Sequence, residues 1–116
     1  MKFAILLLMD DLKVWIDGLV QKLEKLRKKL DIPSKNKRIA DLESRSADQN
    51  LWNDQDKARG ILQELADLKR EVAQFEELSG TIATLGELSR ESALTSDLRR
   101  EIAGAEKDLE KLELRS

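Results

Sequence analysis

The sequence predicts an all-α protein, a helical bundle that contains a long antiparallel hairpin with coiled-coil-like packing. The first observation behind this prediction is spacing, because leucine and isoleucine recur at alternating intervals of three and four residues, the period of a helix seam. The second is composition, since charged residues make up 38% of the chain and aromatic residues only 3%. This balance is typical of long helices with a narrow apolar seam and solvated flanks. No segment has the pattern of a β-strand.

Four helices are expected, over residues 10–31, 34–47, 54–89 and 95–115. Between the first two, Asp31-Ile32-Pro33 interrupts the seam, because the residue before a proline avoids helical torsion angles. Pro33 and Ser34 are well suited to begin the second helix. The last two helices should form the antiparallel hairpin, with the first two packed against it.

The polar gap between the second and third helices contains one large aromatic residue, in the stretch Leu51-Trp52-Asn53-Asp54. Asn53 is predicted to be the N-cap of the third helix, and Asp54 would lie in its first turn, where a carboxylate favours the helix dipole. We expect Leu51, Trp52, Asn53 and Asp54 to form a structural corner with the indole of Trp52 buried in it. An exposed indole that stacks on a nucleic-acid base is the alternative, and the absence of neighbouring aromatic residues disfavours it.

Residues 1–9 form an apolar extension ahead of the helical domain expected over residues 10–116. The run from Phe3 to Met9 is too short to cross a bilayer, which takes about 20 apolar residues. It also lacks the small-residue cleavage pattern of a signal peptide. Met9 offers a second start, so the extension is interpreted as a targeting segment, a non-native addition or an extra apolar helical turn.

The chain has no cysteine and no histidine. Zinc and haem sites therefore lack their usual ligands, and Ser–His or Cys–His nucleophile systems are excluded. Acidic pairs such as Glu87 with Glu91 lie on one helix face, but a di-metal carboxylate site would also need Glu-x-x-His motifs. We expect no cofactor, no metal and no enzymatic activity. The absence of cysteine fits a cytoplasmic protein, and the net charge of −2 predicts no attraction to an anionic membrane.

A basic cluster spans the end of the first helix and the start of the second, with eight positive charges against two negative ones. Its members are Lys22, Lys25, Arg27, Lys28, Lys29, Lys35, Lys37 and Arg38. One interpretation is contact with RNA phosphates, which is salt-dependent and independent of sequence. The other is a solvated helix face whose long side chains cover the seam.

Five segments carry a resemblance to a known family. They are Asp31-Ile32-Pro33, Arg38-Ile39-Ala40-Asp41-Leu42-Glu43, Leu51-Trp52-Asn53-Asp54 with Ala58, Phe75-Glu76-Glu77-Leu78, and Leu109-Glu110-Lys111-Leu112-Glu113-Leu114. Through them, residues 31–114 resemble the amino-terminal helical domain of bacterial peptide chain release factor 2. The tryptophan element resembles release factor 2 more than release factor 1.

The resemblance implies a role in translation termination, with docking near the stalk base of the large ribosomal subunit. It implies the ribosome, including ribosomal RNA phosphates, as the partner. Full-length members read the stop codon through a Ser-Pro-Phe tripeptide and trigger peptide release through a Gly-Gly-Gln tip. Here the one proline, Pro33, is followed by serine, and no two glycines are adjacent. The sequence is therefore interpreted as a first domain that neither decodes nor releases a peptide.

Two other functions stay open at this stage. The first is a structural coiled-coil adaptor or dimerisation module, since the seams could pair with a second chain and make the isolated domain self-associate. Helices that pair only between chains, together with an exposed Trp52, would favour it. The second is a tRNA-binding helical arm, similar to the hairpin of seryl-tRNA synthetases, which would need basic residues at the hairpin tip near residues 89–96.

Overall fold

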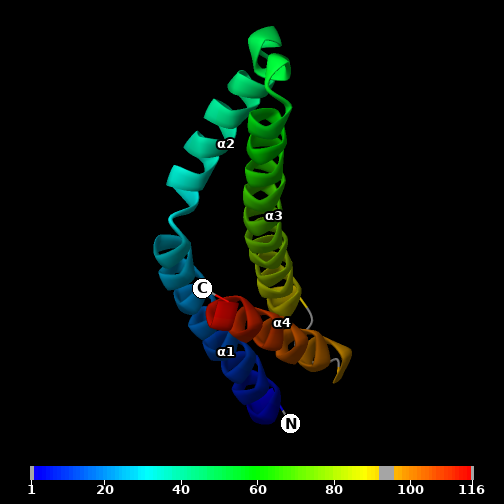
Figure 1. Ribbon diagram of the computed structural model, residues 1–116. Coiled ribbons are helices and arrows are strands. Elements are labelled where there is room, and N and C mark those ends of the chain that lie inside the picture. Colours follow the sequence, from blue (N-terminus) through cyan, green and yellow to red (C-terminus); the bar gives the residue numbers. More distant parts are fainter. Residues whose placement is uncertain (1, 92–95, 116) are drawn as a thin grey trace. The chain divides into compact units, whose positions relative to one another are not determined.

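The computed structural model describes the backbone of residues 2–91 and 96–115 and the side chains of residues 11–90 and 97–115. Nearly all of these residues are helical (Figure 1). The elements are the α-helices α1 (Lys2–Leu30), α2 (Ile32–Ser46), α3 (Gln55–Glu91) and α4 (Ser96–Arg115), and the 3₁₀ helix η1 (Gln49–Asn53). The described residues contain no strand. The all-α prediction is confirmed.

The predicted helix limits agree with the structure to within about three residues, except at the start of α1, which begins at Lys2. The apolar extension is therefore helical in its described backbone and continuous with the first helix. A physical reason is that the run from Phe3 to Met9 contains leucine, alanine and methionine, which are good helix formers, and no glycine or proline. Part of the predicted hairpin tip, residues 92–95, lies outside the described residues.

The chain divides into two compact units. The first contains residues up to Leu30 and residues from Glu76 onward, so it consists of α1, the end of α3 and α4. The second contains Asp31–Phe75, which form α2, η1 and the first part of α3. Within the second unit α2 packs against the first part of α3, as expected, whereas α4 belongs to the first unit with the end of α3. The reason is length: α3 has 37 residues and α4 has 20, so α4 covers only part of the α3 seam and α2 covers another part.

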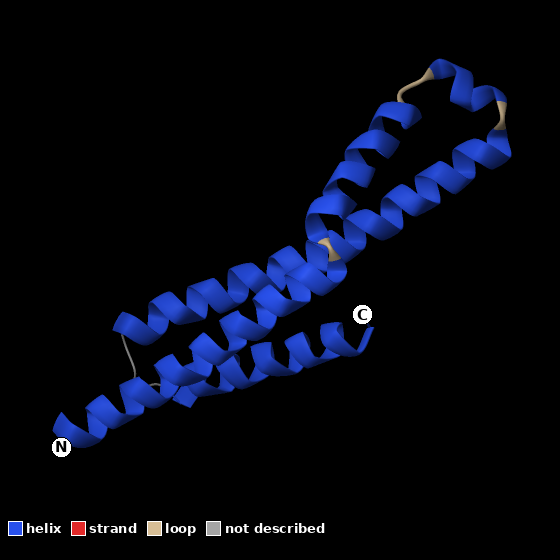
Figure 2. Ribbon diagram, turned by 90° about the vertical axis from the view of Figure 1, so that its left-hand side faces the viewer, coloured by secondary structure: helices blue, strands red, loops and turns tan. Residues whose placement is uncertain are grey.

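In the first unit, each of three helices contributes one buried stripe to a common core. The buried residues are Leu12, Ile16, Leu19, Leu23 and Leu26 from α1, Leu78, Ile82 and Leu85 from α3, and Leu98, Ile102, Ala105 and Leu109 from α4. Figure 2 shows α4 beside α1 and the end of α3, and α4 runs in the opposite direction to α3. A polar contact also joins α1 to α4, because the indole N–H of Trp15 donates to Oε2 of Glu106 at 2.9 Å.

The second unit is a helical hairpin of α2 and the first part of α3. Its core consists of Leu42, Leu51, Ala58, Ile61 and Leu65, with Ile39 and Leu68 at the edge. These residues recur every three or four positions along each helix, so each helix buries one face. The hairpin closes through η1, which lies between α2 and α3.

The interruption predicted at Asp31-Ile32-Pro33 is confirmed, but only Asp31 leaves the helical conformation, and Ile32 and Pro33 already belong to α2. Asp31 has φ 50° and ψ 58°, in the left-handed region, which Asp enters more readily than most residues. Its side chain accepts hydrogen bonds from the backbone N–H of Ser34 at 3.4 Å and from the Ser34 hydroxyl at 2.8 Å. Asp31 therefore ends one helix and caps the next.

The corner is present where the sequence predicts it, but the burial of Trp52 is predicted wrongly. Leu51 is 8% exposed and belongs to the core, whereas Trp52 is 54% exposed. The two residues are neighbours in a 3₁₀ helix, which has three residues per turn, so their side chains leave the axis about 120° apart. Only one of them can face the core, and the structure places Leu51 there.

The capping residue of α3 is also different from the prediction. Oδ1 of Asp54 accepts the backbone N–H of Lys57 at 3.2 Å, and the Asp54 carbonyl accepts the N–H of Ala58 at 3.0 Å. Asp54 is therefore the N-cap, and Asn53 is the last residue of η1. Asp48 caps η1 in a similar way, because its Oδ1 accepts the N–H of Asn50 at 3.0 Å.

Replacing Leu51 with alanine should destabilise the protein far more than replacing Trp52. Leu51→Ala removes a buried side chain and should cost about 2–4 kcal/mol, whereas Trp52→Ala should cost less than about 1 kcal/mol. Urea denaturation followed by circular dichroism measures both. An equal loss from Trp52→Ala would mean that the indole is buried in solution.

The assignment of Asp54, and not Asn53, as the N-cap of α3 can be tested by replacing each residue. Asp54→Ala should lower the free energy of unfolding by about 1 kcal/mol, because it removes the acceptor for an N–H group in the first turn of α3. Asn53→Ala is the matched control and should change stability by less than half of that. A larger effect at Asn53 in thermal denaturation would restore the original assignment.

Candidate functional site

The eight residues of the basic cluster are divided between the two units. Five of them lie on α1 in the first unit and three lie on α2 in the second. The cluster therefore consists of two groups, one on α1 and one on α2.

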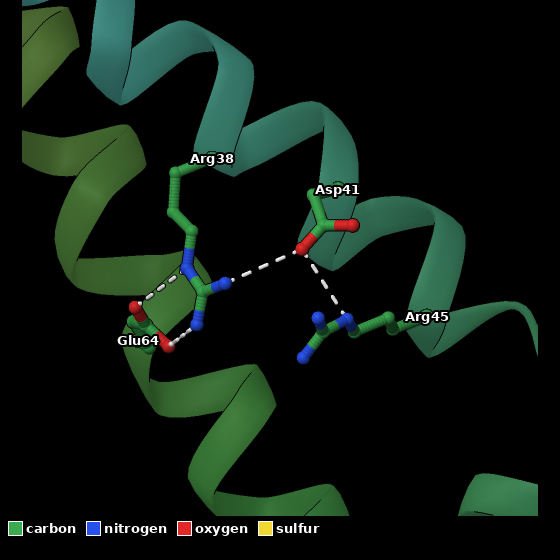
Figure 3. A network of polar contacts seen from close by, with 4 residues as sticks. All are labelled: Arg38, Asp41, Arg45 and Glu64. Atoms are coloured by element: carbon green, nitrogen blue, oxygen red, sulfur yellow. Dashed lines mark hydrogen bonds and ion pairs between the residues drawn. The ribbon is translucent and has the colours of Figure 1, made fainter.

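On α2, two of the three basic side chains are engaged with α3. Nε and Nη2 of Arg38 donate to the two carboxylate oxygens of Glu64, each at 3.0 Å, and Nη1 contacts Asp41 at 3.3 Å (Figure 3). Nζ of Lys35 lies 2.9 Å from Glu71. A third bond between these helices joins Lys69 of α3 to Glu43 of α2 at 2.9 Å. These contacts join α2 to α3 within the hairpin. The sequence analysis did not predict them.

A signal for this pairing is present in the sequence. Glu64 and Glu71 are seven residues apart, so they lie on the same face of α3 two turns apart. Lys35 and Arg38 are neighbours on α2 in the opposite chain direction. An antiparallel hairpin aligns the two sets, but only once α2 is known to pair with α3.

The Arg38–Glu64 pair shifts the pKa of both partners. The hydrogen bonds from Arg38 are the main cause that lowers the pKa of Glu64 below its ordinary value. The same bonds, with the charge of Glu64, raise the pKa of Arg38. Asp41 extends the network, because its Oδ2 also forms an ion pair with Nε of Arg45 at 3.2 Å. The side chains of Arg38 and Glu64 are solvent-exposed, so their contact orients α2 on α3 more than it stabilises the fold.

On α1, Arg27 is engaged with acidic side chains and four lysines are not. Nε of Arg27 lies 3.5 Å from Glu24, and its Nη1 lies 4.0 Å from Glu76. The exposed lysines are Lys22, Lys25, Lys28 and Lys29. Within the described side chains, no carboxylate lies within ion-pair distance of these four.

Three of these lysines share one side of α1. Lys22, Lys25 and Lys29 follow each other at intervals of three and four residues and therefore lie on one helix face. Together with Leu26 and with Glu113 of α4, they line a shallow hollow of about 240 Å³. On α2, Lys37 is exposed as well. Of the eight residues of the basic cluster, those without an ion pair among the described side chains are thus four lysines of α1 and Lys37 of α2.

No catalytic constellation is visible in the part of the chain that the structure describes. No group of three or more acidic side chains lies close enough there to hold a metal ion. Every buried side-chain nitrogen or oxygen atom among the described residues has a hydrogen-bond partner. None of the helices searched is both long and apolar enough to span a bilayer. The arrangement can offer surfaces and charges to a partner.

These features define an all-helical module whose described residues present exposed basic side chains and a shallow hollow. Comparison with known proteins identifies the family. A model of the PCRF domain matches residues 35–116. The chain therefore belongs to the PCRF domain family, and the resemblance to release factor 2 is confirmed.

The chain is similar to several bacterial release factors. It is 37% identical to peptide chain release factor 2 of Thermomicrobium roseum over 71% of this chain, and 39% identical to peptide chain release factor RF2 of Thermus thermophilus over 71%. A release factor 2 from a Mycobacterium species is 34% identical over 86% of this chain. The matched regions make up 21%, 22% and 27% of those relatives. No solved structure shows significant similarity to the chain.

The contact between Arg38 and Glu64 predicts a defined pH dependence. Because the folded pKa of Glu64 is lowered, its contribution to stability is present above the unfolded pKa and is lost as the pH falls through the folded pKa. Arg38→Gln should move the Glu64 titration, followed by carboxyl-carbon NMR, to higher pH. Lys57→Gln is the control, since Lys57 has no ion pair among the described residues, and it should leave that titration in place. An unchanged titration in Arg38→Gln would show that the pair does not form.

Proposed function

We propose that this chain is a ribosome-docking module of a peptide chain release factor, acts in translation termination and carries out no chemistry itself. The observation that carries the proposal is the PCRF domain match over residues 35–116, together with relatives that are named release factor 2. Under this proposal its partner is the large subunit of the bacterial ribosome near the stalk base. Its place of action is the cytoplasm.

The absence of chemistry is supported by the residue content. Without histidine or cysteine, the common nucleophile–base pairs cannot form. The chain also lacks the Ser-Pro-Phe and Gly-Gly-Gln tripeptides that the family resemblance leads us to expect in a protein that decodes and releases. Decoding and peptide release are therefore assigned to other parts of a release factor, and docking to this one.

The exposed lysines of α1 are the proposed contacts with ribosomal RNA phosphates. Lys22, Lys25, Lys28 and Lys29 hold no ion pair within the described side chains, so phosphate binding would not first have to break one. Lys22 and Lys29 lie about 10 Å apart along the helix axis, which lets the row contact more than one phosphate. Lys37 is a fifth contact on the other unit. Arg27, Lys35 and Arg38 are less available, because they already contact carboxylates.

The adaptor alternative required an exposed Trp52 and helices that pair only between chains, and the structure meets only the first requirement. Trp52 is exposed, as that alternative requires. However, the seams of α1, α3 and α4 are buried within one unit of a single chain, so no second chain is needed to cover them. The PCRF domain match also supports the release-factor hypothesis. We therefore retain ribosome docking as the proposed function.

Neutralising the exposed lysines should weaken binding to purified large ribosomal subunits. The variant Lys22→Gln/Lys25→Gln/Lys28→Gln/Lys29→Gln should bind about tenfold or more weakly at physiological salt, with a smaller dependence of affinity on salt, because fewer counterions are released. The control is Lys13→Gln/Lys57→Gln/Lys107→Gln/Lys111→Gln, which removes the same charge elsewhere and should bind nearly as the parent protein does. Equal losses in the two variants would indicate a general charge effect, and no ribosome binding by the parent would remove the proposed function.

A further inference from the structure

A groove with a volume of about 670 Å³ runs between α3 and α4 in the first unit, and these two helices provide all of its lining residues. The residues of α3 that line it recur at intervals of three and four from Glu77 to Leu88, and those of α4 do the same from Glu101 to Asp108. The groove therefore follows the helices over about three turns of α3. A groove between two helices is a surface on which the side chains of an additional helix can pack.

Small side chains make the groove open. Gly80, Thr81 and Thr84 line it from α3, and Gly104 and Ala105 line it from α4. A methyl group placed on Gly80 or Gly104 would meet no atom within 4 Å outside its own helix backbone, so nothing in the described chain fills this space. The hydroxyl of Thr81 donates to the carbonyl of Glu77 at 3.0 Å and is satisfied by its own helix. A ligand in the groove therefore does not have to supply a hydrogen-bond partner for the Thr81 hydroxyl.

One large apolar side chain is left partly uncovered at an end of the groove. Leu88 is 42% exposed, while its neighbour Leu85 is buried at 4% exposure. A partner that covered Leu88 would remove apolar surface from water, which favours association. Leu88 is the apolar anchor of the groove.

The charge of the groove has one sign. Glu77, Glu101 and Asp108 line it, and no lysine or arginine does. None of these three carboxylates forms an ion pair with a cation of the described residues. Three unpaired carboxylates repel phosphate groups, so nucleic acid and anionic membranes fit this surface poorly. A cationic partner fits it well.

We propose that the groove binds an amphipathic α-helix of a partner protein that carries lysine or arginine. Its small and apolar side chains would pack on the floor and on Leu88, and its basic side chains would pair with Glu77, Glu101 and Asp108. The added helix would complete a four-helix arrangement from the three helices of this unit. This site is separate from the lysines of α1 and does not depend on ribosome binding.

The test uses the full chain and a fluorescent synthetic helix of about 20 residues, with leucine and alanine on one face and lysine on its flanks. Fluorescence anisotropy should show saturable, salt-dependent binding. Gly104→Leu fills the groove and should weaken binding by about tenfold or more, whereas Gly18→Leu, at another helical glycine with open space, should not. Circular dichroism and thermal unfolding establish that both variants are folded.

Charge is tested in the same assay. Glu77→Gln/Glu101→Gln/Asp108→Asn should weaken binding by about tenfold at low salt and flatten its salt dependence. The control, Asp17→Asn/Glu87→Gln/Glu110→Gln, removes three exposed carboxylates that do not line the groove and should bind as the parent protein does.

Several results would overturn the proposal. They are no saturable binding of the lysine peptide, equal binding of a glutamate-substituted peptide, or undiminished binding by Gly104→Leu. Analytical ultracentrifugation adds a further check. A dimer of the parent protein that disappears in Gly104→Leu would assign the groove to a second copy of this chain instead.

Discussion

The apolar stripe of α3 is the constraint on which the rest of the structure depends. This helix is 37 residues long and has buried residues from Ala58 to Leu85. A stripe of this length exposed to water would be costly, because each buried leucine or isoleucine contributes about 1.5–3 kcal/mol. The other helices cover it in sections: α2 covers the beginning, and α1 and α4 cover the end. The two units follow from this division.

Polar contacts between helices help to select the register in which the apolar faces pack. In the second unit, Arg38–Glu64, Lys35–Glu71 and Lys69–Glu43 cross between α2 and α3 beside the apolar core. Exposed pairs of this kind add little stability each, but opposite charges at fixed positions disfavour other registers of the hairpin. In the first unit, the bond from Trp15 to Glu106 acts in a similar way between α1 and α4. These contacts also decide which basic side chains remain free to meet a partner.

The free surfaces differ in charge and therefore in the partners that suit them. The exposed lysines of α1 are suited to phosphate, whereas the groove between α3 and α4 has only acidic ionisable groups and an exposed leucine. A net charge of −2 hides this difference, since the positive and negative groups nearly cancel over the whole chain. A helical module with two such surfaces offers separate sites to two chemically different partners.

The sequence by itself determined the helices and the break between α1 and α2, because these depend on residues close together in the chain. The spacing of leucine and isoleucine predicts helices with one apolar face, and Asp31-Ile32-Pro33 predicts the junction. Local reasoning also located the corner at residues 51–54. Only the tertiary structure decided that Leu51, not Trp52, is buried, since a 3₁₀ turn lets one neighbour face the core and the position of α3 selects it. It likewise decided that Lys35 and Arg38 are paired, because their partners lie 36 and 26 residues away and come into reach only when the hairpin forms.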